Sequence, residues 1–176
     1  MRKRFSAISL LGAAFALALA ASASPAQAQN TRDFAHGNGT IEFEGKVSNF
    51  SFTAQRHKDG SVKGTLIYHQ RSATNPENNL SVHMRIDCLT VAGSVATIQG
   101  IITKADPESV FVPGFGDFSL VGAAASMTVN DAGEGNPDGD MASFLYITGA
   151  RSNFCAIAFP PEMYRTTNVI VRSAQP

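Results

Sequence analysis

The sequence predicts an all-β domain, folded as an antiparallel β-sandwich or as a small closed β-barrel of about eight or nine strands. Three observations support this prediction. Apolar and polar residues alternate with a period of two in successive short segments, turn signals separate these segments, and no helical period extends over a useful length after residue 28. The patterning does not separate a sandwich from a barrel, because both bury one face of each strand.

The first 28 residues have the pattern of a secretory signal peptide. Three basic residues at positions 2–4 precede an apolar run, and the small-residue pattern Ala26-Gln27-Ala28 follows it. We therefore expect export to a periplasm or to the cell exterior. No later apolar stretch is long enough to cross a bilayer as a helix, so we expect no transmembrane segment after signal removal.

The exported chain is expected to be slightly acidic. Removing the signal peptide takes away three of the 14 basic residues and none of the 14 acidic ones, which leaves a net charge of about −3. This sign argues against nucleic acid and anionic lipid as partners. The remaining length fits one domain with a single core, which we place at residues 39–176 after a flexible polar leader at 29–38.

The strands can be assigned in order along the chain. The turn signal Asp59-Gly60 separates the second segment from the third. The clearest strand alternates apolar and polar side chains over residues 80–90 and carries Cys88 on its apolar face. We expect strands near residues 41–43, 50–54, 62–68, 80–90, 95–104, 118–130, 142–148, 155–159 and 168–172.

The two cysteines of the chain, Cys88 and Cys155, are predicted to form a disulfide. Both lie in the exported part, where an oxidising compartment permits the bond. Closing a loop of 67 residues stabilises the fold by about 4 kcal/mol in the chain-entropy model. The alternative is a pair of buried free thiols.

The sharpest local signal is VNDAGEGNPDGD, residues 129–140. It holds four acidic residues and no basic one, and we take Asp131, Glu134, Asp138 and Asp140 as candidate ligands of a Ca²⁺ ion. The spacing matches neither an EF-hand nor a nonapeptide calcium repeat. The alternative is a solvated turn, because Asn, Asp and Gly favour turns and acidic tips protect strand edges.

Two histidines form a second candidate site. If residues 61–71 and 80–90 form a hairpin with their apolar faces together, Tyr68 lies opposite Met84 and His69 opposite His83. Two imidazoles at that spacing supply part of a zinc or copper site, which needs further ligands. The alternative is a pair of surface histidines.

A Gly- and Pro-rich stretch carries three aromatic residues. Phe111, Phe115 and Phe118 lie within residues 110–118, and a long loop with aromatic side chains is a candidate binding edge. The alternative is a loop that folds its own rings inward.

Several short β-type segments occur together along the chain: Gly64–Tyr68, Val82-His83, Ile86–Gly93, Ala96–Gly100, and the stretch from Val129 to Asp138. In these segments, which span roughly residues 39–147, the chain resembles the post-COAP type of uncharacterised exported bacterial β-domain. The resemblance implies a secreted β-rich module. It implies no established reaction, cofactor or catalytic residue.

We therefore expect a non-catalytic binding or structural module of the cell envelope or exterior, with a ligand or partner that the sequence does not identify. One alternative is a small β-barrel or jelly-roll enzyme with a pocket formed by Tyr68, His69, His83 and Arg85. Another is a structural domain that associates with other chains through its C-terminal strand, Asn168–Arg172.

Overall fold

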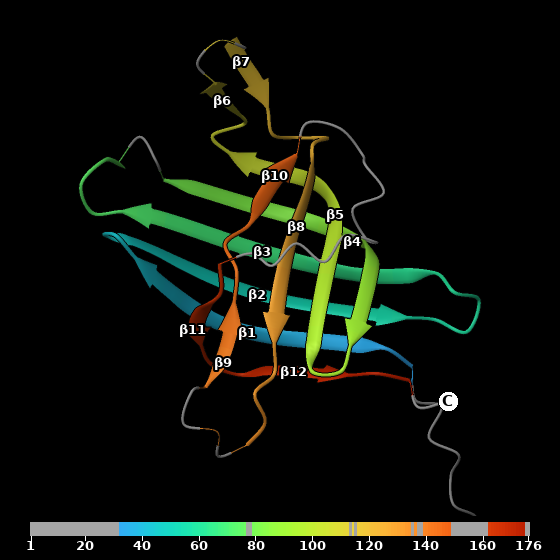
Figure 1. Ribbon diagram of the computed structural model, residues 1–176. Coiled ribbons are helices and arrows are strands. Elements are labelled where there is room, and N and C mark those ends of the chain that lie inside the picture. The colour runs from blue at the N-terminus through green and yellow to red at the C-terminus, as the bar shows by residue number, and fades with distance from the viewer. Residues whose placement is uncertain are drawn as a thin grey trace, which may run out of the picture.

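The protein is almost entirely β-structure and folds as a nearly closed barrel (Figure 1). The computed structural model describes residues 32–76, 79–112, 114, 116–134, 136, 139–148 and 162–174. Ten strands form one antiparallel sheet, and two further strands form a separate hairpin. The predicted all-β fold is confirmed. Within the described ranges, no helix is long and apolar enough to cross a membrane.

Twelve strands are described. They are β1 (Phe34–Phe43), β2 (Lys46–Arg56), β3 (Val62–Ser72), β4 (Leu80–Ala92), β5 (Val95–Asp106), β6 (Ser109–Val112), β7 (Gly116–Ser119), β8 (Ala124–Asn130), β9 (Asp140–Ala142), β10 (Tyr146–Thr148), β11 (Tyr164–Thr166) and β12 (Val169–Arg172). The order around the sheet is β11-β9-β8-β5-β4-β3-β2-β1-β12, and β10 also pairs with β8. The first five strands are therefore a simple antiparallel meander.

The first strand starts earlier than the sequence predicts. Residues 34–38, expected to belong to a flexible leader, lie in β1 instead. This segment pairs with β2 on one edge and with β12 on the other, where Phe34 lies opposite Arg172 and Gly37 opposite Val169. Hydrogen bonding on both edges of β1 outweighs the weak strand preference of Gly37 and Asn38. Residues 29–31 lie outside the described part.

Two of the predicted strands are interrupted. The segment 118–130 is divided between β7 and β8 by a turn that includes Gly122, whose φ is 89°. The segment 142–148 is divided between β9 and β10 at Ser143. The Ser143 N–H donates to the Thr128 carbonyl oxygen at 2.9 Å, but the Thr128 N–H donates to the Ser143 hydroxyl at 3.0 Å, so a side chain replaces the backbone acceptor and the ladder ends there. The short β11 is missed by the sequence prediction, and the predicted strand 155–159 lies outside the described residues.

Inward-facing side chains fill the barrel. Tyr68 is 1% exposed, and its hydroxyl donates a hydrogen bond to the Ser48 Oγ at 2.9 Å. Burial raises the pKa of Tyr68 above its ordinary value. The largest fully buried side chains around it are Ile41, Leu66, Met84, Ile86, Leu89, Ile98, Ile102, Leu120 and Met127. The barrel interior is therefore a packed core of apolar side chains.

Two glycines of β1 make room for two phenylalanines of β2. Gly37 pairs with Phe52, and Gly39 pairs with Phe50. A Cβ atom would lie 3.2 Å from the Phe52 ring at Gly37 and 3.1 Å from the Phe50 ring at Gly39. Each ring therefore packs over a position that has no side chain, which is a known way to stabilise glycine in a sheet.

An irregularity in β4 reverses which side chains face inward. Up to Ile86 the even-numbered apolar residues are buried, but the register shifts between Ile86 and Cys88, and Leu89 becomes the next buried residue. One extra residue in a strand moves the following side chains to the opposite face. Cys88 is consequently half-buried on the outer side of the barrel, and not on the apolar inner face that the alternation predicts.

Gly100 lies opposite this irregularity and permits the close approach of β4 and β5. A Cβ atom on Gly100 would lie 1.9 Å from the Arg85 carbonyl oxygen, which belongs to the backbone and cannot rotate away. We expect Gly100→Ala to lower the free energy of unfolding by about 2 kcal/mol in urea denaturation. Gly39→Ala is the comparison: its Cβ would meet the Thr166 side chain first, with the Thr167 carbonyl oxygen at 3.0 Å and the Phe50 ring at 3.1 Å, and these contacts need smaller shifts than the backbone clash at Gly100. A loss at Gly39 as large as that at Gly100 would contradict this explanation.

The two ends of the sheet meet through an aromatic cluster. Phe43, at the end of β1, has its ring centroid 4.9 Å from that of Tyr164 in β11, and Phe144 lies 4.8 Å from Tyr164. The Tyr164 hydroxyl donates to a Glu162 carboxylate oxygen at 2.7 Å, and this bond, with the nearby negative charge, raises the pKa of Tyr164 to about 12. The cluster joins β1 to β11 across the line where the barrel closes.

Candidate functional site

Two residues of the acidic segment close the barrel at its other junction, between β12 and the chain that joins β8 to β9. Asp131 follows β8, and Asp140 begins β9. Both carboxylates reach the edge of β12 that does not pair with β1. Glu134 is exposed on the same loop, and Asp138 lies outside the described residues.

Each of these two carboxylates accepts one hydrogen bond from its own loop and one from β12. The Asp131 Oδ1 accepts from the Gly133 N–H at 2.9 Å, and its Oδ2 accepts from the Val171 N–H at 3.0 Å. The Asp140 Oδ1 accepts from the Ala132 N–H at 3.1 Å, and its Oδ2 accepts from the Val169 N–H at 2.7 Å. We name this arrangement, Asp131 and Asp140 with the N–H groups of Val169 and Val171, the carboxylate seam.

In the carboxylate seam, aspartate oxygens accept the N–H groups of β12 that a neighbouring strand would otherwise accept through its backbone carbonyls. Val169 and Val171 alternate along β12, so the two aspartates take successive N–H groups of that edge. Hydrogen bonds from N–H groups to an ionised acceptor are stronger than those between neutral groups. The density of acids that marks this segment in the sequence therefore has a structural role, in which Asp131 and Asp140 hold a strand edge.

The calcium site stays a prediction. No group of three or more His, Cys, Asp or Glu side chains within the described ranges is arranged to hold a metal ion, and Asp138 is not among those residues. A Ca²⁺ ion bound to Asp131 or Asp140 would share their oxygens with backbone N–H donors. An open hollow of about 500 Å³ lies beside the seam, and Glu134 lines it together with both aspartates.

The structure does not place His69 opposite His83. His69 pairs with Ser81 and His83 with Ile67, while Tyr68 lies opposite Val82 and not Met84, a difference of two residues from the predicted register. The ladder between β3 and β4 begins only at Gln70 and Leu80, because the Ser72 N–H donates to the Asn79 Oδ1 at 2.9 Å. The two imidazoles are therefore diagonal neighbours, which are farther apart than a directly opposed pair.

The four residues of the enzyme alternative do not share a pocket. His69, His83 and Arg85 occupy the outward-facing positions of β3 and β4, whereas Tyr68 points into the core. The C-terminal strand, proposed above for association with other chains, pairs with β1 on one edge and has two N–H groups of its other edge in the carboxylate seam.

The aromatic stretch 110–118 forms the β6–β7 hairpin, which projects from one end of the barrel (Figure 1). Val110 and Phe118 lie opposite each other and pack against the core. Phe111 points the other way and is 72% exposed. Phe115 lies outside the described residues. Each of the two alternatives predicted for this stretch therefore describes one ring: the Phe118 ring packs inward against the core, and the Phe111 ring is exposed to solvent.

Of the two cysteines in the predicted disulfide, only Cys88 lies within the described residues. Cys88 lies in β4 opposite Gln99, and Cys155 falls outside the described residues. The bond between them stays a prediction.

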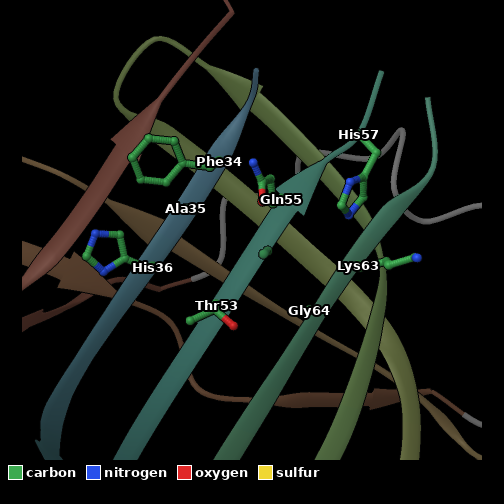
Figure 2. Close-up of a pocket in the computed structure, with 9 residues that line it drawn as sticks. Phe34, Ala35, His36, Thr53, Gln55, His57, Lys63 and Gly64 are labelled. Carbon is green, nitrogen blue, oxygen red and sulfur yellow. The ribbon is translucent and has the colours of Figure 1, made fainter. Parts of the chain in front are cut away.

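An open groove, which the sequence does not predict, lies on the outer face of β1, β2 and β3. It has a volume of about 550 Å³, and its polar lining consists of His36, Thr53, Gln55, His57 and Lys63 (Figure 2). Phe34 borders it, with its ring stacked on His36 at a centroid distance of 5.7 Å. These residues are scattered in the sequence and become neighbours through strand pairing, for example Gln55 with Phe34 and Lys63.

Comparisons of the chain with protein-family models, with curated proteins and with solved structures found no match.

Proposed function

We propose that this protein is a non-catalytic binding module of the cell envelope or exterior, and that it engages a protein partner through the β6–β7 hairpin. The observation that carries the proposal is Phe111, which is 72% exposed at a projecting position. Among the large apolar side chains of the described residues, the second most exposed is that of Tyr146, which is 47% exposed. A large ring displayed to solvent is typical of residues that anchor protein interfaces.

The hairpin presents this ring on a supported backbone. Val110 and Phe118 attach its inner side to the core, and the Leu120 N–H donates to the Glu108 carbonyl oxygen at 2.9 Å where the hairpin leaves the barrel. Phe111 itself lies opposite Asp117 in the ladder. A side chain on a supported strand loses less conformational entropy on binding than one on a free loop.

The charges around Phe111 favour one kind of partner surface. Asp106, Glu108 and Asp117 are exposed at the base and on the second strand of the hairpin. An apolar ring flanked by carboxylates complements an apolar pocket bordered by Lys or Arg side chains. The same charges disfavour insertion into an anionic lipid surface.

Site-specific crosslinking tests the proposal. A photoreactive benzoyl analogue of phenylalanine at position 111 is expected to capture one protein in cells that produce the chain. The same analogue at Ile67, which is 39% exposed on the side of the barrel, is expected not to capture it.

The affinity of the captured protein then provides the decisive measurement. We expect Phe111→Ser to weaken its binding to the purified chain about 30-fold, which corresponds to about 2 kcal/mol. The thermal stability is expected to change little, because Phe111 is mostly exposed. An unchanged dissociation constant, or crosslinks to lipid alone, would rule out the hairpin as a protein-binding element.

A further inference from the structure

We infer that the outer face of β12, β1, β2 and β3 is a second binding site, and that its ligand is an anionic sugar chain carrying carboxylate or sulfate groups. This site is separate from the β6–β7 hairpin and goes beyond the proposed protein-binding function. Its centre is the open groove lined by His36, Thr53, Gln55, His57 and Lys63 (Figure 2).

Strand pairing sets these side chains in rows across the outer face. In one row Arg172 of β12 lies opposite Phe34 of β1, Phe34 opposite Gln55 of β2, and Gln55 opposite Lys63 of β3. In the next row His36 lies opposite Thr53. Directly opposed residues are close enough for one ligand to touch both. The rows bring a guanidinium, an ammonium and two imidazoles to one surface.

The charge of this surface favours an anion. The residues that line the groove include Lys63 and two histidines, and no Asp or Glu is among them. Arg172 adds a guanidinium at its border, 5.4 Å from the centre of the Phe34 ring. Such a contact holds the guanidinium over the ring while its N–H groups stay available for a carboxylate or a sulfate.

Two carboxylates that follow or precede groove residues in the sequence, those of Asp33 and Asp59, make hydrogen bonds of their own. Asp33 accepts from the Arg56 Nε at 3.0 Å and from the Ala174 N–H at 2.8 Å. Asp59 accepts from the Ser61 hydroxyl and the Ser61 N–H, at 2.6 and 2.9 Å. Neither belongs to the residues that line the groove. On the side of β12, His36 and Arg172 also line the neighbouring hollow that contains Asp131, Glu134 and Asp140. We therefore expect an anionic group to bind on the side of the groove where Lys63 lies, and Arg172 to contribute only at the border.

The uncharged residues of the same face favour a sugar over a simple ion. Thr53 and Gln55 supply a hydroxyl and an amide inside the groove, and the outward positions that continue from it along β1 and β2 are Asn38, Thr40, Asn49 and Ser51. Hydroxyl and amide groups both donate and accept hydrogen bonds, as sugar hydroxyls require. The stacked rings of Phe34 and His36 add an apolar surface for sugar C–H groups.

The groove is open to solvent, and the outward positions of β1 and β2 beyond it are exposed and polar. A sugar chain can lie across such a face and contact several residues in succession, whereas a small anion would touch one or two. We therefore assign the face to an oligosaccharide with repeated negative charges, whose acidic groups meet Lys63 and Arg172 while its hydroxyls meet the residues between them.

Isothermal titration of the purified protein tests this site with three probes. They are a short oligogalacturonate, which carries carboxylates, a heparin-derived oligosaccharide, which carries sulfates, and an uncharged maltooligosaccharide. We expect binding of at least one acidic probe and no heat with the uncharged one. Binding of the first alone identifies carboxylate recognition, and binding of the second alone identifies sulfate recognition.

Substitutions then locate the site. We expect Lys63→Gln and Arg172→Gln each to weaken binding of the acidic probe roughly 5- to 10-fold, because each removes one charge-assisted contact. Lys58→Gln is the matched control: Lys58 is exposed in the adjacent turn and does not line the groove, and its substitution is expected to leave the affinity unchanged. Thermal melts of all three variants confirm that they are folded.

Three results would overturn the inference: no binding of either acidic probe, equal binding of the uncharged probe, or equal losses in the Lys63, Arg172 and Lys58 variants. None of these results bears on the hairpin. Conversely, an unchanged partner affinity in Phe111→Ser would leave the sugar site untouched.

Discussion

Replacing Asp131 and Asp140 together by asparagine is expected to lower the free energy of unfolding by about 3–4 kcal/mol. Each aspartate accepts two backbone N–H groups, one from its own loop and one from β12. Asparagine keeps one acceptor oxygen but turns an NH₂ group toward the second donor, so one N–H at each site loses its partner. The melting temperature is expected to fall by roughly 6–12 °C.

Amide exchange identifies the cause of this loss. In the double variant the amides of Val169 and Val171 are expected to exchange faster with solvent, because their acceptors are in the carboxylate seam. Glu134→Gln is the matched control, since Glu134 is an exposed acid of the same loop and is not part of the seam. A Glu134→Gln variant as unstable as the double variant would point to loop charge, and not to the seam, as the source of stability.

If Cys88 and Cys155 form the predicted disulfide, its reduction is expected to lower the free energy of unfolding by about 4 kcal/mol, because the unfolded chain regains the freedom of a 67-residue loop. Urea denaturation with and without a reductant measures this difference. The Cys88→Ala/Cys155→Ala double variant is expected to match the reduced protein, with no further effect of reductant.

A thiol assay on the unfolded, unreduced protein provides an independent check. The disulfide predicts no reactive thiol before reduction and two after it. Because the irregularity in β4 turns Cys88 to the outer side of the barrel, Cys88 would form the bond on that side. Two reactive thiols before reduction, together with an unchanged urea midpoint, would exclude the bond.

The strands are predictable from the sequence where burial on one face determines them. Period-two alternation identifies β2, β3, β4 and β5, and β4 begins at Leu80 as predicted. The alternation fails at the irregularity after Ile86, because a bulge is a property of two strands together and Gly100 on β5 is what permits it. Closure into a barrel cannot be predicted from local patterns either, because it depends on contacts of β1 with β11 and of β12 with the aspartates that flank the β8–β9 loop.

For the candidate sites too, local sequence patterns predict some features, while contacts between distant strands determine the others. Acid density draws attention to the loop 129–140 as a candidate calcium site, and that site stays a prediction. The β12 partners of Asp131 and Asp140 lie 40 and 29 residues away, so no local pattern predicts the carboxylate seam. The pairing of His69 with His83 fails because a side chain, Asn79, takes the N–H of Ser72 and shifts the start of the ladder. The outer-face groove is missed because its residues are ordinary polar residues until the strands align them.

The pairing of Phe34 with Arg172 has a consequence for how the chain folds. Contacts between distant parts of a sequence require costly loop closure before they contribute stability, and they slow folding. β1 can pair with β2 early, but its second edge has no partner until β12 has been synthesised. An incomplete chain therefore carries an open strand edge that can pair with other chains, and the pairing of β12 with β1 is the step that removes this risk.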